Sequence, residues 1–279
     1  MSIRIITDST ADLTPAYQPK ATVIPLTIRF GEEEFADGVE MSKEEFYQRL
    51  VTSPEVPTTS QIPPQTFADV FQQVAEDGDE AIVITVSQKL SGTYQSACIA
   101  AEDYDCITVV DSKNVAIGSG VLVEYAIDLL EQGDDRATIV EKVTEAREKV
   151  HLVAVLDTLE YLKKGGRISK TVAFAGGLLS IKPVIGLENG EIKMLGKARG
   201  TKMGNTALNQ QINATGGIDF SRPFTLGYTG TNDDLLKKYL DDSKPMWKPF
   251  WKKLPVMLIS GVIGTHAGPG AVAVAFFAK

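Results

Sequence analysis

Three segments of the chain carry hydroxyl, glycine and histidine residues in patterns that could hold a ligand. Thr59 and Ser60 stand shortly before a pair of prolines that would start a helix, and Ser91 and Gly92 stand at the mouth of a second helix-like pattern. Unpaired backbone N–H groups at a helix N-terminus favour an anion, and hydroxyl groups add further donors. Glycine lets a ligand approach the backbone closely. The third segment, 264–270, places His266 in a predicted glycine-rich loop between two strand-like runs.

Serine and threonine are also the preferred helix caps, so each hydroxyl segment alone favours a cap over a binding site. The two segments together with His266 make an anion site an equal alternative. A phosphate loop usually carries a lysine after its glycines, and none is present here; the run Gly118-Ser119-Gly120 has Val123 in place of the third glycine of a dinucleotide motif. Hydroxyls, amides and one histidine can satisfy a single carboxylate without a formal ion pair. The residue types therefore indicate a carboxylate ligand.

A serine acyl-hydrolase (an esterase) is the alternative function. It would use Ser91 as nucleophile and His266 as base, since catalytic groups distant in sequence can meet in space. The sequence around Ser91 lacks the G-x-S-x-G spacing of an α/β-hydrolase elbow. Asp111 and Asp157, at predicted strand ends, could orient a histidine, but each also fits a cap or a turn.

The remaining chemically interesting residues predict neither a metal site nor a cofactor. The chain has two histidines, His151 and His266, and no spacing of ligand residues typical of zinc. Arg167 and Arg199 fit exposed or ion-paired surface positions. The segment WKPFWKK (247–253) could touch a membrane surface or a partner, although a packed, irregular helix end is the commoner structure for such a pattern.

Alternating strand and helix patterns must position these residues. The runs 3–9, 81–87, 106–112 and 151–157 are continuously apolar, as in parallel strands buried on both faces. Helical spacing of apolar residues appears over 67–74, 94–101 and 119–149. After residue 157 the pattern changes, with Asn189–Gly190 as a hairpin turn and strand-like runs at 224–230, 255–264 and the C-terminus. These patterns predict an α/β domain at 1–157 and a second, hairpin-rich domain at 158–279.

Composition excludes several classes of protein. The 279 residues carry a net charge of −8, with a pI near 5.0, which argues against nucleic-acid binding. Two cysteines, Cys98 and Cys106, fit buried free thiols in a reducing compartment better than a disulfide. No signal-peptide pattern and no spanning apolar run is visible, so we expect a cytoplasmic protein.

Seven motifs spread over nearly the whole chain resemble those of the DegV family. They are, in order, TDSTADL, PTTSQ, SGTYQSA, VVDSKN, LEYLKKGGRI, KPVIGLENGEI and GTHAGPG. The resemblance implies an N-terminal Rossmann-like α/β/α domain with a mainly parallel sheet and a C-terminal α+β domain with a mixed or antiparallel sheet. It also implies a long-chain fatty acid enclosed between the two domains. Two stretches depart from the family pattern: the residues after GTHAGPG, which read AVAVAFF, and the WKPFWKK segment.

The resemblance further implies a binding subunit that is not catalytic by itself. Family members resemble the subunit of a bacterial fatty acid kinase that presents a bound carboxylate to a separate, ATP-using kinase subunit, which forms the acyl phosphate. Carried over by position, the carboxylate would meet Thr59, Ser60, Ser91, the amide of Gly92 and His266. Arg167 and Arg199 match arginines linked to the kinase partner or the phosphoryl group. Tunnel-lining candidates, chosen because they flank the motifs, are Ile62, Phe174, Leu178 and Leu179. A kinase in its own right is disfavoured, because no nucleotide loop is visible.

Overall fold

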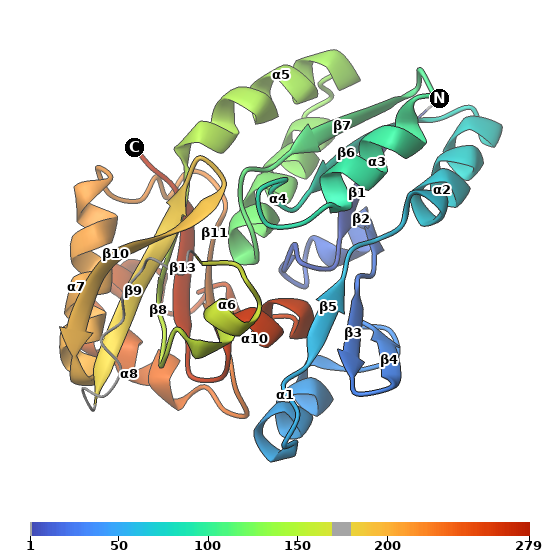
Figure 1. The fold of residues 1–279 in the computed structure, drawn as a ribbon. Coiled ribbons are helices and arrows are strands. Elements are labelled where there is room, and N and C mark those ends of the chain that lie inside the picture. Colours follow the sequence, from blue (N-terminus) through green and yellow to red (C-terminus); the bar gives the residue numbers. More distant parts are fainter. Residues whose placement is uncertain (1, 169–179) are drawn as a thin grey trace.

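The N-terminal half of the protein is built on a parallel sheet. The computed structural model describes residues 2–168 and 180–279. Four strands pair in parallel in the order β2-β1-β6-β7, with the bounds Ala21–Ile24, Ile3–Asp8, Glu80–Thr85 and Ile107–Asp111. Five of the six residues of β6 are buried, in agreement with a continuous apolar strand at the centre of a sheet. The parallel sheet expected from the apolar runs is confirmed (Figure 1).

The second half is built on a larger, mixed sheet. Its order is β10-β9-β8-β13-β11-β12, with the bounds Glu191–Arg199, Ile181–Glu188, Val150–Val155, Val272–Phe277, Phe224–Tyr228 and Val256–Leu258. All pairs are antiparallel except β11 with β12. The predicted hairpin is confirmed: Asn189 and Gly190 join β9 to β10 with φ of 51° and 80°, as a two-residue turn with both central φ positive requires.

A small third sheet lies beside the other two. It has the order β4-β3-β5, with the bounds Glu33–Ala36, Thr27–Phe30 and Thr58–Ser60. Helix α1 (Lys43–Thr52) lies between β4 and β5 in the chain. Ser42 and Glu45 form a complete capping box at the start of α1. The buried face of α1, with Phe46 and Tyr47, contacts the short helix α10 (Gly261–Ala267).

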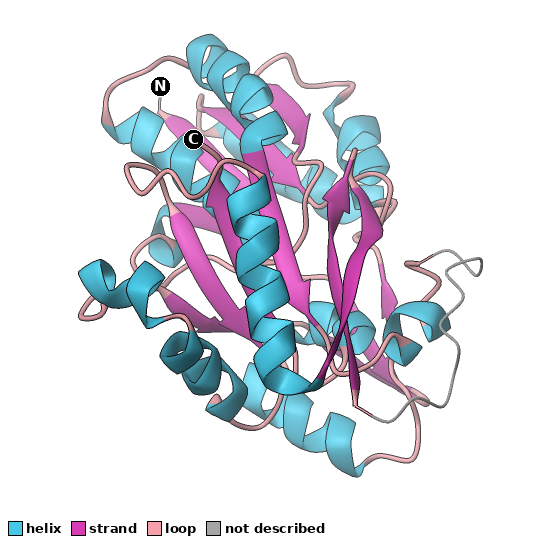
Figure 2. Ribbon diagram, turned by 90° about the vertical axis from the view of Figure 1, so that its left-hand side faces the viewer, coloured by secondary structure: helices cyan, strands magenta, loops and turns pink. Residues whose placement is uncertain are grey.

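Helices fill the layers between and outside the sheets. Helices α2 (Pro64–Glu76) and α3 (Thr93–Ala101) pack against each other and against the parallel sheet, and α5 (Arg136–Ala146) also contacts this sheet. Helix α4 (Ile117–Glu131) contacts strands of both large sheets, and eleven of its fifteen residues are buried. Helices α7 (Gly200–Ala214) and α8 (Asp234–Asp242) cover the mixed sheet; in Figure 2 α7 lies across the front of it. The short elements are α6 (Glu160–Lys164), α9 (Lys244–Trp247) and the 3-10 turns Gln18–Lys20, Arg147–Lys149 and Lys248–Phe250.

The expectation of a fourth parallel strand at 151–157 is wrong. This segment is β8, which pairs antiparallel with β13 and β9 in the mixed sheet. A continuous apolar run reports burial on both faces, and α4 and α7 supply that burial here. The run therefore carried no information on strand direction. The chain changes sheets before β8, and the proposed division at 157/158 stays a prediction.

Three smaller expectations also differ from the structure. The pattern over 119–149 forms two helices, because Gly133 (φ 92°) ends the first and Asp135 caps the second by accepting the Thr138 N–H. The strand expected over 255–264 is three residues long and is followed by α10. Both cysteines are free, as expected, but they are half-buried instead of buried.

Within the described residues, no helix is both long enough and apolar enough to cross a bilayer.

The layer that α4 forms leaves no space at Gly120. A Cβ at this position would lie 2.5 Å from the backbone carbonyl oxygen of Asp12. We therefore expect Gly120→Ala to lower the free energy of unfolding by about 1–3 kcal/mol. The matched control is Gly196→Ala, where a Cβ would meet nothing within 4 Å. Urea unfolding of both variants is the measurement, and equal stability of the two would contradict this packing.

Candidate functional site

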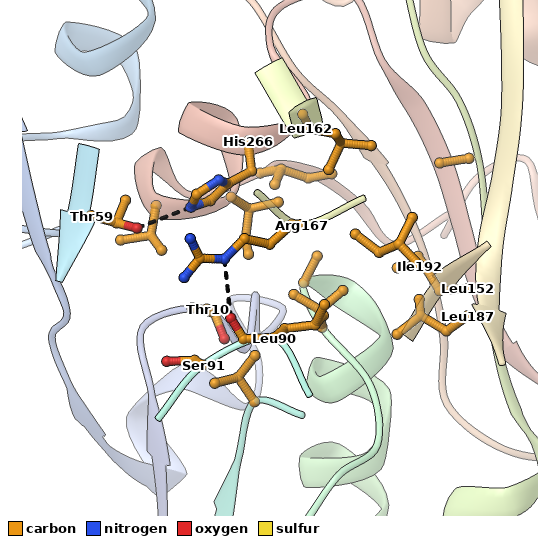
Figure 3. Close-up of a pocket in the computed structure, with 18 of the residues that line it drawn as sticks. Thr10, Thr59, Leu90, Ser91, Leu152, Leu162, Arg167, Leu187, Ile192 and His266 are labelled. Carbon is orange, nitrogen blue, oxygen red and sulfur yellow. Dashed lines mark hydrogen bonds between the residues drawn. The ribbon is translucent and has the colours of Figure 1, made fainter. Parts of the chain in front are cut away.

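A cavity with a volume of about 400 Å³ lies between the two large sheets. This volume falls in the range of roughly 300–1,000 Å³ typical of ligand pockets. Aliphatic side chains form most of its wall, among them Leu90, Leu152, Leu162, Leu187 and Ile192. Figure 3 shows that the polar side chains gather at one end, while Leu152, Leu187 and Ile192 lie at the other. The cavity therefore has a polar end and an apolar end.

The polar end lies at the carboxyl ends of two neighbouring parallel strands. Thr10 follows β1, and Ser91 follows β6. The chain runs from β1 outward to β2 and then returns to the opposite side of β1 to form β6. The connections thus diverge at the β1–β6 pair, and the crevice outside such a pair is the usual ligand position in open α/β sheets.

His266 and Thr59 come together at this end from distant segments. The Oγ1 atom of Thr59, on β5, lies 2.9 Å from Nε2 of His266, on α10. Nδ1 of His266 is buried without a hydrogen-bond partner, and a Cβ at Gly165 would lie 2.1 Å from it. A buried N–H without an acceptor is costly, so the proton of the neutral ring belongs on Nε2, which donates to Thr59. The hydroxyl hydrogen of Thr59 is then available to a ligand.

Burial keeps this imidazole neutral. Burial, together with the nearby positive charge of Arg167, lowers the pKa of His266 from 6.5 to about 4. The ring is therefore uncharged at neutral pH. It serves as an orienting hydrogen-bond donor and is a poor proton acceptor.

Arg167 supplies the positive charge of the polar end. Its Nε donates to the Leu90 carbonyl at 3.1 Å and its Nη1 to the Gly165 carbonyl at 2.6 Å. Among the described residues no carboxylate pairs with it. The guanidinium group lies between the His266–Thr59 pair and Ser91 (Figure 3). One cation next to a neutral histidine and several hydroxyls suits an anion with a single charge.

The pocket face of the loop after β1 is organised by a buried carboxylate. Asp8 accepts hydrogen bonds from the N–H and Oγ1 of Thr10, at 3.0 and 2.5 Å, and from the Val86 N–H at 2.7 Å. Both Thr10 and Val86 line the cavity. Sequence reasoning did not single out Asp8 or Thr10, although a D-x-T spacing after a buried strand is a signal for such a turn.

All five residues predicted to meet the ligand line the cavity: Thr59, Ser60, Ser91, Gly92 and His266. Their local settings differ from the expectation. Thr59 and Ser60 belong to a strand, because Thr58–Ser60 pairs with β3 before the helix starts. His266 lies on a helix instead of in a loop. A Cβ at Gly92 would lie 2.0 Å from Oε1 of Gln61, so the end of the Gln61 side chain packs against this glycine at the start of α3.

Ser91 combines a capping role with its place in the wall. Its Oγ accepts the Thr93 N–H at 3.2 Å and lies 2.9 Å from Thr93 Oγ1. The cap and the ligand-binding interpretation are therefore compatible at this residue, and the second stays a prediction.

The remaining predicted residues divide into three cases. Arg167, expected to meet a partner or phosphoryl group, lines the cavity, whereas Arg199 is exposed at the far end of β10 and does not. Ile62 is wrong as a lining residue: it is buried in the core with Phe67 and Phe71. Its neighbour Gln61 lines the cavity, together with Thr59 and Ser60. Phe174, Leu178 and Leu179 lie outside the described residues.

The geometry does not support a serine hydrolase. Ser91 bonds Thr93 and His266 bonds Thr59, so no nucleophile–base pair forms between them. The two aspartates considered as orienting groups are engaged elsewhere: Asp111 holds Gln88 and Lys113, and Asp157 pairs with Lys182. In the described ranges, no three His, Cys, Asp or Glu side chains converge as a metal site would require.

Comparison with known proteins places the whole chain in one group. The model of the family described as "Uncharacterised protein, DegV family" matches residues 2–279. A DegV domain-containing protein of Caldanaerobacter subterraneus is 36% identical over 282 residues, covering 99% of each chain. Among solved structures, a DegV family protein from Thermus thermophilus, described by its fatty acid binding, superposes with a TM-score of 0.86 at 30% identity over 100% of both chains. A stearic-acid-binding protein from Eubacterium ventriosum superposes with a TM-score of 0.84 at 29% identity, covering 99% of this chain and 97% of that one.

The low pKa of His266 predicts a specific pH dependence of stability. The unfolded chain binds a proton at His266 near pH 6.5, whereas the folded chain does so only near pH 4. Stability contributed by this difference is complete above pH 6.5 and is lost as the pH falls toward 4. At 1.36 kcal/mol per pKa unit, the free energy of unfolding of the wild type should fall by about 3 kcal/mol relative to His266→Gln between pH 7 and pH 4. Urea unfolding of the lipid-free proteins is the measurement, and a constant difference across this range would contradict the buried, neutral ring.

Proposed function

The chain belongs to the DegV family, and from this membership and the geometry of the cavity we propose that it binds a long-chain fatty acid. The carboxylate occupies the polar end, and the acyl chain follows the aliphatic walls toward the mixed sheet. The observation that carries the proposal is the cavity itself, with several hydroxyls and one cation at one end and aliphatic side chains at the other; this cation pairs with no carboxylate among the described residues. The fatty acids bound by the relatives from Thermus thermophilus and Eubacterium ventriosum support this ligand class.

Most of the affinity comes from the acyl chain. Burying about a dozen methylenes contributes roughly 10 kcal/mol at ~0.8 kcal/mol each. Part of this gain is offset by the lost freedom of the ligand. The polar end therefore mainly orients the carboxylate. Its charge and hydroxyl groups also favour binding of an acid over an uncharged lipid of equal length.

Each polar group has a distinct role in holding the carboxylate. Arg167 provides the compensating charge from a guanidinium group fixed by two backbone carbonyls. Thr59 donates its hydroxyl hydrogen, because His266 Nε2 donates to its oxygen. Ser91 and the amide of Gly92 complete the set from the opposite side, at the start of α3.

The proposal includes presentation of the carboxylate to a separate, ATP-using kinase subunit that forms the acyl phosphate. Ser60 and Gln61, in the wall of the polar end, are exposed, which suits access of a partner to this end. Arg199 is exposed and lies outside the cavity, which suits contact with a partner. The protein needs no cofactor of its own in this scheme. Its cytoplasmic location stays a prediction.

Contact of the WKPFWKK segment with a membrane or partner is a weaker part of the proposal. Trp247 is fully buried against Tyr239 and Phe224, as in a packed helix end. Trp251 is 45% exposed and is followed by the exposed Lys252 and Lys253. Only this second half of the segment is available to another surface.

The head-group roles predict a selective loss in Arg167→Met. Removing a charge-assisted hydrogen bond of about 1.5–3 kcal/mol should weaken palmitate binding roughly 10- to 100-fold. Binding of 1-hexadecanol should change little, because its hydroxyl does not need the charge. The matched control Arg199→Met should bind both lipids like the wild type. Titration calorimetry after lipid removal measures this, and native mass spectrometry of the purified protein should show a co-purified fatty acid. A wild-type protein that carries none and takes none up rules out the proposal.

The presentation step predicts a division of labour between two proteins. The chain alone, with ATP and palmitate, should form no acyl phosphate, and adding a fatty acid kinase subunit should produce it. Arg199→Glu should reduce this product while leaving palmitate affinity unchanged. Acyl hydroxamate formation is the assay. Acyl phosphate formed by the chain alone would indicate a self-sufficient kinase, and hydrolysis of p-nitrophenyl palmitate that is lost in Ser91→Ala would restore the hydrolase alternative.

A further inference from the structure

A second cavity, of about 270 Å³, lies close to the start of α10 and is lined by charged side chains. Asp12, Asp37 and Lys43 are among its lining residues, together with Ser260. The two aspartates are 3% and 4% exposed. The three charged residues come from different parts of the fold: Asp12 follows β1, Asp37 follows β4 and Lys43 begins α1. None of these residues lines the first cavity.

Asp12 ties α1 to the segment that enters α10. It accepts a hydrogen bond from Lys43 Nζ at 2.7 Å, from the Ser260 N–H at 2.9 Å and from Ser260 Oγ at 3.3 Å. Lys43 Nζ also donates to the Leu258 carbonyl at 2.9 Å. Residues 258–260 are thereby held through both a carbonyl and an N–H.

Asp37 holds the first residue of the helix. Its Oδ1 accepts the Gly261 N–H at 3.1 Å, while its Oδ2 is buried and accepts no hydrogen bond. Burial, followed by the neighbouring charge of Asp12, raises the pKa of Asp37 to about 6, although the nearby Ser9 side chain and the Gly261 N–H act in the opposite direction. A buried carboxylate with one unpartnered oxygen is unfavourable for stability compared with an apolar contact.

Two glycines allow close packing of α10 on its neighbours. A Cβ at Gly261 would lie 2.6 Å from the Ile28 side chain, and a Cβ at Gly264 would lie 2.6 Å from both Phe46 and the Tyr47 hydroxyl. The two glycines thus let α10 rest directly on α1 and β3. His266 is the sixth of the seven residues of the helix. Because a two-turn helix moves as one body, fixing its first residue fixes the position of His266.

We propose that Asp12, Lys43 and Asp37 are positioning residues for the carboxylate site, holding the start of α10 so that His266 meets Thr59. Their own contacts are with backbone groups at 258–261 and not with the ligand. The inference rests on the proposed function only for the identity of the ligand. The position of His266 itself is measurable in the empty protein.

The experiment compares Asp37→Ala with Asp37→Asn. Alanine removes the acceptor for the Gly261 N–H, whereas asparagine keeps an oxygen in its place. The chain has two histidines, so the imidazole NMR signals of His266 and His151 can be followed separately in the lipid-free protein. In Asp37→Ala the pKa of His266 should rise from about 4 toward 6.5 as the ring loosens and becomes hydrated. The signal of His151, on β8, should titrate as in the wild type, and Asp37→Asn should restore the low pKa of His266.

Binding provides the second readout. Palmitate affinity should fall roughly 10-fold in Asp37→Ala, while 1-hexadecanol affinity should hold, because the aliphatic walls stay in place. The control is Glu124→Ala, which removes an equally buried carboxylate that accepts hydrogen bonds from Thr14 and, among the described residues, from no group of α10. This control should leave the pKa of His266 and the preference for the acid unchanged. Lys43→Met, which keeps the aliphatic stem but leaves the buried Asp12 without its cation, should shift both readouts in the same direction as Asp37→Ala and gives an independent test.

Two outcomes would overturn the inference. One is an unchanged His266 titration in folded Asp37→Ala or Lys43→Met. The other is an equal loss of palmitate and 1-hexadecanol, matching the effect of Glu124→Ala. A wild-type protein that binds neither lipid would contradict the proposed function instead, and the NMR titration would still test the positioning role.

Discussion

Helix α4 packs against both large sheets at once, and the arrangement of the rest of the structure depends on this packing. It contacts strands of the parallel sheet and of the mixed sheet, so it sets the distance between them. Helix–sheet and helix–helix layers are separated by roughly 10 Å. The cavity reaches α4 at the N-terminal end of the helix. Val115 and Ala116, at its start, line the cavity, and Ala116 is held at φ 54° and ψ −141°, a conformation that costs free energy outside glycine. The start of α4 therefore forms part of the wall of the cavity.

The distribution of charge makes one end of this pocket suitable for an anion in a protein with a net charge of −8. Asp8, Asp12 and Asp37 are buried close to the site, but each carboxylate is engaged by backbone N–H groups or by Lys43. Arg167, in contrast, bonds only neutral carbonyls among the described residues. The acidic groups are used within the loops around the cavity, and the guanidinium charge has no acidic partner among the described residues.

Sequence patterns identified the residues of the site better than their surroundings. Hydroxyl and histidine residues in three motifs were expected to converge, and they do line one cavity. Thr59 was assigned to a helix start because Pro63 and Pro64 follow it, yet pairing with β3 makes it part of a strand. The glycines near His266 suggested a loop, but Gly261 and Gly264 serve close packing on α1 within a helix. The prediction that Ile62 lines the cavity was based on its closeness to a motif in the sequence, which does not reveal the direction of its side chain; Ile62 lies in the core instead.

By itself, the sequence determined the alternation of strands and helices, the Asn189–Gly190 hairpin and the kinds of chemical group available, because these follow from local periodicity, turn chemistry and residue type. Only the tertiary structure decided that β8 runs antiparallel in the second sheet, that Arg167 lines the cavity while Arg199 does not, and that Asp37 reaches α10. Strand direction, cavity walls and buried charge contacts depend on which distant segments pack together. A local pattern reports that a residue is buried, but it does not report the residue against which it is buried.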